Sequence, residues 1–494
     1  MPRLHSEVRE IEQKAGSNPW SSTKSLPQAA AMAEQIKAMK VRVESSKLVK
    51  PSYEGKPPST DLCVPLSVFD KINYKVHGAV IYAFGPPTPA NTDIEKGLVT
   101  ALSEHREWAG RLHEDARGET VILLNDAGAR LIEASSDAVL DRAVIHEPST
   151  ALLPLHPWVK GVEELLQVQL TRFACGTLVV GFTSHHWVAD GHSMSKFIVA
   201  WGLATRGLPM DPLPLHGRGA FFIPRNPPRI EFEHRGVEFT AKKAFNTEDD
   251  VAQADDIVST SNKAIDTEDD VAKAEDIVFH KAHFSREFLE MLKAKASLGA
   301  DRRYNTFESL MAHLWRVVSV ARGLDERITS GIRISVNGRA RLRPPVPDEF
   351  LGNLVLWAFP RVKVGDLVSR PLQFAAALIH QETASINDGY FRSLIDFASL
   401  EDVKDEELEG AAEANYRVMS PNLEVHNLAR FPFWDLDFGG GKPFMFMPCY
   451  VPVEGIMFLV PSPSGDRSMD AYVSLLKHNV ASFKQLCHLV RPNL

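Results

Sequence analysis

The chain has 494 residues, of which 44% are hydrophobic and 24% are charged, a composition typical of a globular protein. Its length favours two domains, because a single hydrophobic core stops growing at roughly 250–300 residues. The net charge of −8 argues against nucleic acid as a partner, since phosphate binding needs a basic surface, and no apolar run is long enough to cross a membrane.

The first part of the chain changes its pattern near residue 39. Residues 1–38 are polar and alanine-rich, and we interpret them as an N-terminal extension without chemistry of its own. They lack the apolar core of a signal peptide. From Met39 onwards apolar and polar residues alternate, which predicts the first strand. We therefore expect an N-terminal domain over residues 39–220.

The most informative segment of this domain surrounds two adjacent histidines. Residues 166–171 alternate and residues 176–182 form a short apolar run, so both are predicted strands. Apolar residues then recur at helical spacing over residues 194–201. His185 and His186 are therefore expected in a loop between a buried strand and a helix, a position that often carries function.

The middle of the chain is predicted to connect two domains. A proline-rich stretch at residues 208–228 opens a crossover that we place at residues 221–282. It contains an acidic insertion at residues 243–278, in which one segment occurs twice. Two copies are too few for a solenoid, and the shortage of large apolar residues predicts a solvated insertion. A C-terminal domain is expected over residues 283–494, with a helix near residue 310 and further strands.

The four cysteines, Cys63, Cys175, Cys449 and Cys487, stand far apart and form no Cys-x-x-Cys pair. Neither a disulfide framework nor a thiolate metal site is therefore expected. Isolated cysteines suit a reducing compartment, so the predicted location is the cytoplasm.

The cluster of His185, His186, Asp190 and His192 allows three interpretations. The side chains could simply make local hydrogen bonds within a loop. They could bind a metal ion, although Gly191 disfavours the continuous helix that would bring His186 and Asp190 to one face. His186 could instead be a general base at a strand end, because a neutral imidazole suits proton removal near pH 7. We favour the general base and expect no metal.

Four ordered motifs resemble one enzyme family. His186 and Asp190 resemble the His-x-x-x-Asp motif of the BAHD acyltransferases. Residues 437–441, Asp-Phe-Gly-Gly-Gly, resemble the second motif of this family, Asp-Phe-Gly-Trp-Gly. Between them, residues 339–345 and 351–353 resemble its Arg-x-Arg-Leu-x-Pro-Pro and Phe-Gly-Asn segments. The resemblance extends from about residue 40 to the end of the chain, apart from the insertion.

Further stretches resemble one branch of this family, the amine hydroxycinnamoyltransferases of grasses, which include agmatine coumaroyltransferases. These stretches are residues 106–112, 123–130, 171–176 and 386–391. The glycine at position 440, where the family usually has tryptophan, also looks like that branch. The resemblance therefore implies transfer of a coumaroyl or feruloyl group to an amine.

The resemblance implies an α/β fold with mixed sheets, built as two chloramphenicol-acetyltransferase-like domains with the active-site channel between them. It implies acyl-CoA as a co-substrate, with no permanently bound cofactor and no metal. His186 would take a proton from the acceptor nitrogen as this nitrogen attacks the thioester carbonyl, and the CoA thiol would leave. Asp190 would turn away from the substrate and pair with Arg339.

The second motif, by the same resemblance, lies away from the reacting atoms. Asp437, Gly439 and Gly441 would keep a loop in shape, since glycine adopts backbone angles that other residues resist. The family also implies CoA contacts near Arg302, Arg303 and Thr306. A basic pair at a helix start could meet phosphate, or it could simply be solvated.

The type of acceptor is predicted from the charge that the acceptor carries at neutral pH. Alkyl amines titrate near about 10 and are cationic at pH 7, so their site should offer a carboxylate. Glu424 and His426 lie on the strand that precedes the second motif and that lines the acceptor side in the family. Glu424 suits a cation such as agmatine, putrescine or tryptamine, unless it is an ordinary surface carboxylate. The alternative is an O-acyltransferase that acts on shikimate, quinate or another alcohol. In either case we expect a monomer that handles small molecules.

Overall fold

The computed structural model describes residues 40–140, 148–158, 161–241, 276–401, 403, 406, 408–411 and 418–490. Val41–Leu494 form one compact unit. The N-terminal extension and nearly all of the duplicated insertion lie outside the described residues. The hypotheses on these two segments, and the proposed domain boundaries, therefore remain predictions.

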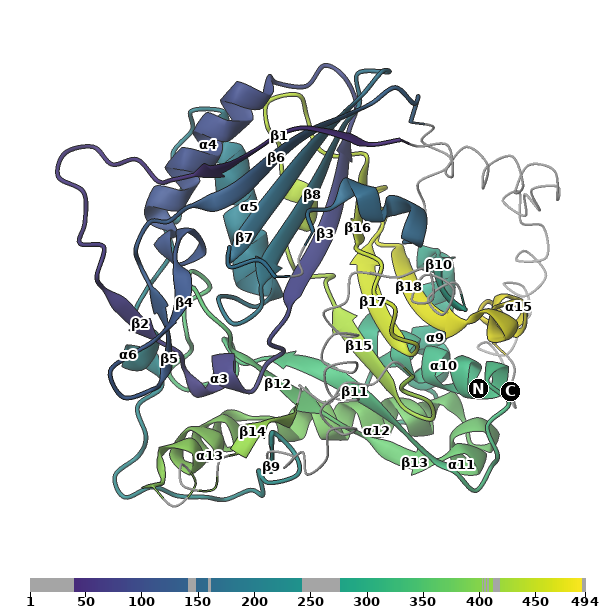
Figure 1. The fold of residues 1–494 in the computed structure, drawn as a ribbon. Helices are drawn as coiled ribbons and strands as arrows, with labels where there is room; N and C mark the ends of the chain where they lie inside the picture. Colours follow the sequence, from purple (N-terminus) through teal and green to yellow (C-terminus); the bar gives the residue numbers. More distant parts are fainter. Residues whose placement is uncertain are drawn as a thin grey trace, which may run out of the picture. The chain divides into compact units, whose positions relative to one another are not determined.

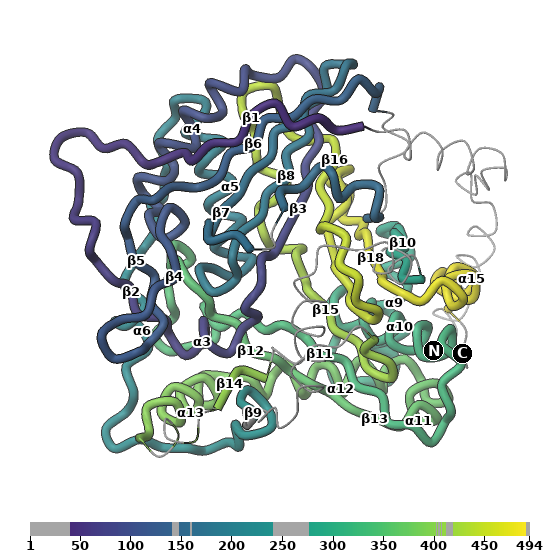
Figure 2. The backbone as a smooth tube through the Cα atoms, viewed as in Figure 1, coloured from purple at the N-terminus to yellow at the C-terminus, as the bar shows by residue number. Residues whose placement is uncertain are grey.

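The first sheet has six strands in the order β1-β6-β7-β8-β3-β16 (Figure 1). Only β6 and β7 run parallel, and the other neighbouring pairs are antiparallel. The strands are β1 (Arg42–Val49), β6 (Ala129–Ser136), β7 (Leu166–Phe173), β8 (Leu178–His185), β3 (His77–Phe84) and β16 (Met445–Pro448). β16 comes from late in the chain, and the smooth tube of Figure 2 shows it beside β3. The C-terminal part of the chain thus completes the sheet that the N-terminal part begins.

The second sheet has the strand order β10-β18-β17-β15-β11-β12, and β13 also pairs with β11. The strands are β10 (Ile277–Phe284), β18 (Met469–Leu476), β17 (Ile456–Pro461), β15 (Leu423–Asn427), β11 (Thr329–Asn337), β12 (Val355–Ala358) and β13 (Arg361–Lys363). β15 runs parallel to both of its neighbours, β11 and β17. It is therefore an interior strand, and its side chains lie among those of the neighbouring strands.

Helices cover both sheets. α4 (Asn91–Glu104) and α5 (Gly191–Thr205) lie against the first sheet (Figure 1). α9 (Arg286–Ala296), α10 (Thr306–Ala321), α12 (Leu372–Ser385) and α15 (Lys477–Leu486) pack together beside the second sheet. α10 begins at a capping box, in which Asn305 and Glu308 each accept a hydrogen bond from the other's backbone N–H. Almost all of α10 is buried, so it forms the centre of this layer.

Shorter elements connect these layers. They include α3 (Val68–Lys71), η1 (Arg106–Ala109), η2 (Thr150–Leu155), α6 (Arg218–Phe221), α11 (Val364–Ser369), α13 (Asp388–Ser399) and η4 (Phe433–Asp435). Two small sheets are built from β2 (Cys63–Pro65), β5 (Thr120–Leu123) and β4 (Arg111–Glu114), and from β14 (Leu408–Gly410) and β9 (Phe239–Ala241).

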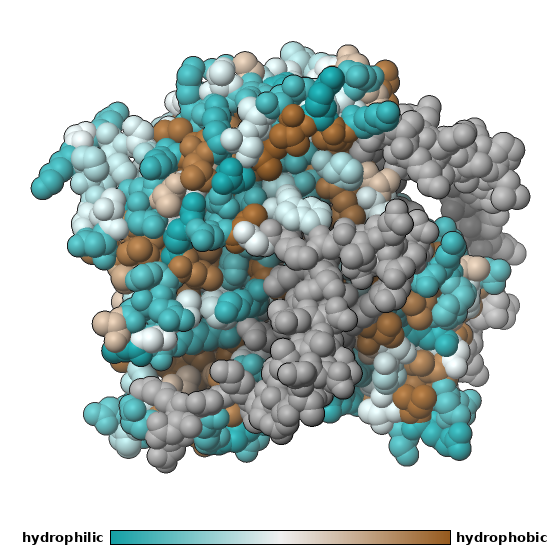
Figure 3. Space-filling view, in the orientation of Figure 1, coloured by the Kyte–Doolittle hydropathy of each residue, from teal (hydrophilic) through white to brown (hydrophobic). Residues whose placement is uncertain are grey.

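The strands and helices predicted around the two histidines are present, at positions within a few residues of those expected. The first strand differs, because it starts at Arg42 and only Val49 is buried on it. Val43 and Leu48 on this edge strand are exposed, so the apolar residues of the predicted pattern do not form a buried face. On the face in Figure 3, hydrophobic residues lie in small groups among hydrophilic ones. None of the described helices is both long and apolar enough to cross a membrane.

α4 and α5 approach each other most closely at Gly97. A β-carbon at this position would lie 2.6 Å from both the Cα and the backbone N of Thr205. Gly97→Ala should therefore lower the unfolding temperature, because overpacking costs about 1–3 kcal/mol and outweighs the gain of about 1 kcal/mol in helix propensity. Thermal unfolding followed by circular dichroism tests this. Gly219→Ala is the control, since nothing lies within 4 Å of its added carbon, and an equal loss in both variants would contradict the close approach.

Candidate active site

His186 and Asp190 occupy the two ends of a short loop. His185 is the last residue of β8, and α5 begins at Gly191. Asp190 caps this helix, because its carboxylate accepts a hydrogen bond from the Ser193 N–H at 3.0 Å. The strand–loop–helix arrangement predicted from hydrophobic periodicity is therefore present.

Side chains from distant parts of the chain hold the backbone of this loop. The Asn353 side-chain amide donates to the His186 carbonyl at 2.7 Å. The Arg218 guanidinium donates to the Trp187 carbonyl at 3.1 Å and also to the Val188 carbonyl. The three consecutive carbonyls are thus satisfied without a regular helix or sheet, as buried backbone groups must be.

Asp70 joins the two side chains that hold the loop. It is fully buried at the end of α3, with an ion-pair distance of 2.8 Å to Arg218. It also accepts a hydrogen bond from the Asn353 side-chain amide at 2.8 Å. A buried arginine needs such a counter-charge, since an unpaired buried charge costs several kcal/mol. Sequence reasoning missed Asp70 and Arg218, whereas Asn353 lies in a motif that was recognised but given no role.

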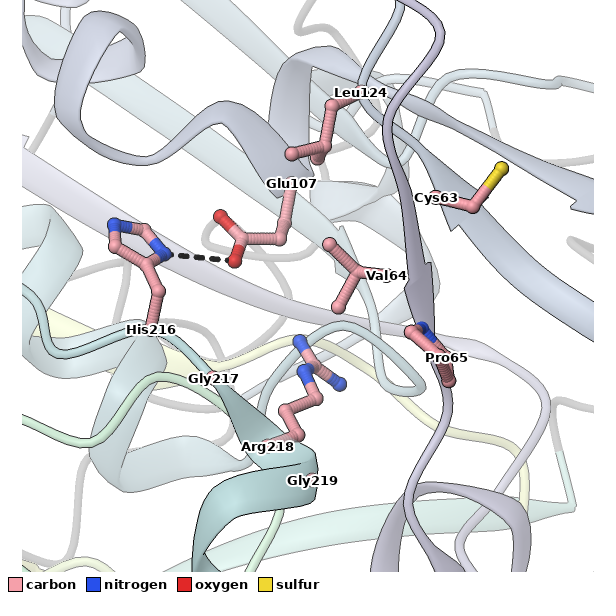
Figure 4. Close-up of a pocket in the computed structure, with 9 residues that line it drawn as sticks. All are labelled: Cys63, Val64, Pro65, Glu107, Leu124, His216, Gly217, Arg218 and Gly219. Carbon is pink, nitrogen blue, oxygen red and sulfur yellow. Dashed lines mark hydrogen bonds and ion pairs between the residues drawn. The ribbon is translucent and has the colours of Figure 1, made fainter.

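A pocket of about 260 Å³ lies beside Arg218 (Figure 4). Its lining residues are Cys63, Val64, Pro65, Glu107, Leu124, His216, Gly217, Arg218 and Gly219. Inside it, His216 Nδ1 and a Glu107 carboxylate oxygen are 2.8 Å apart. Burial raises the pKa of Glu107, but His216 and Arg218 outweigh this effect and leave it below its usual value. The arginine that holds the loop thus also forms a wall of this pocket.

Asp190 pairs with Arg339, as the family resemblance implies. The shortest of their two contacts is 2.7 Å, and both side chains are about 2% exposed. The same guanidinium donates to the Ser193 hydroxyl and to the Phe350 and Gly352 carbonyls. Burial raises the pKa of Asp190, yet the charge and hydrogen bonds of Arg339 outweigh it, so the pKa lies below its ordinary value. The carboxylate is therefore occupied by structural contacts.

The histidines of the cluster differ in their surroundings. Burial, opposed by Asp190 and reinforced by His426, lowers the pKa of His186, so its imidazole is neutral at pH 7. His185 Nδ1 accepts a hydrogen bond from the Trp187 backbone N–H at 3.2 Å. His192 Nε2 lies 2.9 Å from a backbone carbonyl oxygen, that of Asp348.

These contacts bear on the alternative of a metal site. Asp190 is paired with Arg339, and the His192 ring is paired with backbone, so neither side chain turns toward His186. Nowhere in the described ranges do three His, Cys, Asp or Glu side chains gather in a way that could hold a metal ion. The four residues of the metal hypothesis thus do not form such a group.

Glu424 is not a surface carboxylate. It is 1% exposed, and the Tyr74 hydroxyl lies 2.7 and 2.6 Å from its two oxygens. His426 Nε2 lies 2.9 Å from Glu424 Oε1. Burial raises the pKa of Glu424, but His426, Arg333 and Tyr74 together leave it below its usual value.

Tyr74 connects this carboxylate to the loop. Its ring stands edge-on to the His186 ring, with the centroids 6.3 Å apart. Tyr74 thus contacts both Glu424 and His186, although Glu424 lies in the second sheet and His186 follows a strand of the first. No local signal in the sequence marks Tyr74, because it stands in the loop before β3.

The Asp-Phe-Gly-Gly-Gly motif lies at the other end of α5. The Asp437 carboxylate accepts hydrogen bonds from the Gly439 and Gly441 N–H groups at 2.7 and 2.9 Å. Both glycines have positive φ, at 109° and 99°, which other residues resist. A β-carbon at Gly440 would collide with the Pro87 carbonyl oxygen, so this backbone cannot carry tryptophan there. A 15-residue helix spans about 22 Å, which separates this loop from Asp190.

Arg302, Arg303 and Thr306 lie elsewhere. Arg302 and Arg303 are exposed just before α10, and Thr306 is the first residue of that helix. Arg302 contacts the His380 side chain and packs over the Tyr304 ring at 5.9 Å. The structure does not bring these residues together with the cluster around His186.

Comparison with known proteins assigns the chain to a family. Residues 39–489 match the family model described as the transferase family. The chain belongs to this family, the BAHD acyltransferases. It is 50% identical to agmatine hydroxycinnamoyltransferase 1 of Oryza sativa subsp. japonica, with 92% of this chain and 99% of that protein covered. It is 47% identical to putrescine hydroxycinnamoyltransferase 3 of the same organism, with 91% and 99% covered. The predicted family is therefore confirmed, and the protein is an acyltransferase.

The fold is also confirmed by a solved structure. The crystal structure of vinorine synthase superposes with a TM-score of 0.66 at 19% identity, covering 92% of this chain and 99% of that one. At this identity the similarity concerns the fold alone. The predicted mixed α/β architecture is correct.

The Asp190–Arg339 pair should behave as one unit. Asp190→Asn and Arg339→Met should each lower the unfolding temperature, because breaking a buried pair from one side costs about 3–5 kcal/mol. The double variant should lose less than the sum of the two. Asp435→Asn and Lys442→Ala provide the matched control, since this pair is exposed and exposed pairs contribute about 0–1 kcal/mol. Additive losses at Asp190 and Arg339 would contradict the coupling.

Proposed function

We propose that this BAHD acyltransferase transfers a hydroxycinnamoyl group from its CoA thioester to the amino group of a small amine. The products would be a hydroxycinnamic acid amide and CoA. The names of the relatives support amine acceptors such as agmatine and putrescine. The observation that carries the proposal is the buried carboxylate of Glu424, one aromatic ring away from the neutral imidazole of His186.

His186 is the proposed general base. The acceptor nitrogen attacks the thioester carbonyl, and His186 takes a proton from this nitrogen while the C–N bond forms. The tetrahedral intermediate then collapses, the C–S bond breaks, and the sulfur leaves as a thiolate that takes up a proton. A lowered pKa suits this role, because the imidazole is unprotonated before the reaction.

Asp190 is proposed to be a positioning residue for the loop that carries His186. Its carboxylate contacts Arg339, Ser193 and Leu354, so it anchors the end of the loop that carries His186. Asp437, with Gly439 and Gly441, is proposed to hold the opposite end of α5.

Glu424 is the proposed acceptor-binding residue, with His426 as its neighbour. A carboxylate attracts a cationic amine and repels an acceptor that carries a carboxylate, such as shikimate or quinate. The arrangement therefore favours amide formation over the O-acylation of such acids. The cationic end that Glu424 holds would be the one that does not react, since the attacking nitrogen must become neutral.

Several finer assignments belong to the same proposal. Arg302, Arg303 and Thr306 are proposed to contact CoA, which the exposure of the two arginines and the place of all three at the start of α10 support. The two-domain division with a channel between the domains is proposed on the basis of the family resemblance. A cytoplasmic location is proposed because the cysteines are isolated, and the protein is also proposed to be a monomer.

His186→Ala should reduce turnover by about 10²- to 10⁴-fold while the unfolding temperature stays near that of the wild type, because a general base contributes about this much. The assay is mass-spectrometric detection of the amide formed from coumaroyl-CoA and agmatine. His478→Ala, which changes an exposed histidine on α15, is the control and should keep full activity.

The pH dependence provides a second readout for His186. Because the pKa of His186 is lowered in the free protein, the acidic limb of kcat/KM should have its midpoint below the ordinary histidine value of about 6.5. A midpoint above this value, or an unchanged limb in His186→Ala, would contradict the assignment.

Glu424→Gln should weaken the binding of amines that carry a second positive charge. A hydrogen bond to a charged group contributes about 1.5–3 kcal/mol, which corresponds to about 10- to 150-fold in apparent affinity. The loss should be largest for agmatine and putrescine and smaller for tryptamine, whose only amine must become neutral. The KM of coumaroyl-CoA should not change. Equal losses for all three amines would show that Glu424 is not the selector.

A further inference from the structure

Glu424 already has a cation beside it, the guanidinium of Arg333. Arg333 on β11 and Glu424 on β15 are directly paired neighbours in the parallel register. Arg333 Nη1 lies 3.6 Å from Glu424 Oε2 and 3.5 Å from the Tyr74 hydroxyl. The guanidinium carbon also lies 4.3 Å from the centroid of the Trp357 ring.

Aromatic rings and one carboxylate surround this guanidinium. The Trp357 ring stands edge-on to both the Tyr74 and the His426 rings, with centroids 6.1 and 5.7 Å away. A tryptophan face with a nearby carboxylate is the usual environment of a bound organic cation. In addition, Trp357 Nε1 is buried and has no hydrogen-bond partner within the described part of the chain. The cluster thus has the chemistry of a cation subsite, which Arg333 occupies.

Arg333 is held more loosely than the buried Arg339. Arg339 makes a charge-assisted contact of 2.7 Å to Asp190, whereas both polar contacts of Arg333 are 3.5 Å or longer. Charge-assisted N–H···O bonds are normally about 2.7–2.9 Å long. The side chain of Arg333 is also 23% exposed, compared with 2% for that of Glu424. It can therefore leave the subsite toward solvent without breaking a short hydrogen bond.

We propose that Arg333 determines acceptor specificity by occupying the cation subsite, from which the charged far end of the acceptor displaces it. This inference rests on the proposed function. A guanidinium acceptor replaces the stacking of Arg333 on Trp357 with stacking of its own, because both groups are planar. An ammonium end supplies the positive charge beside Glu424 but cannot stack on Trp357. The displacement of Arg333 costs the same for both kinds of end, so Arg333 selects between acceptors that place a charged end in the subsite and acceptors that lack such an end.

The decisive variant is Arg333→Met, which keeps an unbranched apolar side chain and removes the charge. The apparent KM should fall by about 3- to 30-fold for agmatine and for putrescine, since a competing cation–π contact is lost. The KM of tryptamine and that of coumaroyl-CoA should stay unchanged. The ratio of the agmatine and putrescine KM values should stay the same, because both acceptors displace the same arginine.

Arg361→Met is the matched control, because Arg361 also stacks on an aromatic ring, that of Phe359 at 4.1 Å, on the neighbouring β13. It should leave all four Michaelis constants unchanged. If Arg333→Met lowers the unfolding temperature more than the control does, Arg333→Lys is measured in its place, since this variant keeps the charge and loses the planar stack. The KM of agmatine should fall in Arg333→Lys as well.

Two results would overturn the inference. A higher KM for both charged acceptors in Arg333→Met would show that the arginine supports their binding, and equal or absent shifts for all three amines would show that it does not select. In both cases the wild type still forms amides, so the proposed function stands. A wild type that forms no amide with any of these amines would overturn the proposed function and this inference together.

Discussion

The structure depends on the buried ionic contacts that hold the loop between β8 and α5. The carbonyls of His186, Trp187 and Val188 all receive hydrogen bonds from Asn353 or Arg218, and Asp70 compensates the charge of the arginine. Buried polar groups in irregular backbone need such partners, because no water is there to replace them. The loop therefore keeps one conformation, and the position of the His186 imidazole follows from it.

The two sheets contribute different parts of one site. The loop with His186 extends from the first sheet, while Arg339 and Asn353, which hold it, come from the segments that follow β11 in the second half of the chain. β16 ties the same two halves together through the first sheet. Any relative shift of the sheets would change the distance between His186 and Glu424. The proposed chemistry thus depends on packing that both halves share.

The charges around Glu424 explain how a buried carboxylate is tolerated. Taking an ion out of water costs several kcal/mol unless other charges compensate it. Arg333 supplies a charge, Tyr74 and His426 supply hydrogen bonds, and together they keep the pKa of Glu424 low despite its burial. The carboxylate is thus stable in the empty protein and remains able to exchange one cationic partner for another. A site that binds cations needs both properties.

The sequence by itself determined the family, the order of the motifs and the strand–loop–helix that carries His186. The family followed from the resemblance of the motifs, whereas the strand–loop–helix followed from local periodicity and from contacts a few residues apart, such as the cap from Asp190 to Ser193. The Asp190–Arg339 pair was predictable only through the family resemblance. Tertiary structure alone revealed the contacts of Asp70, Tyr74 and Arg333. Tyr74 and Glu424 are 350 positions apart, and Asp70 and Asn353 are 283 apart. Side-chain contacts over such separations leave no periodic pattern in a single chain, because they arise only when the two sheets pack together.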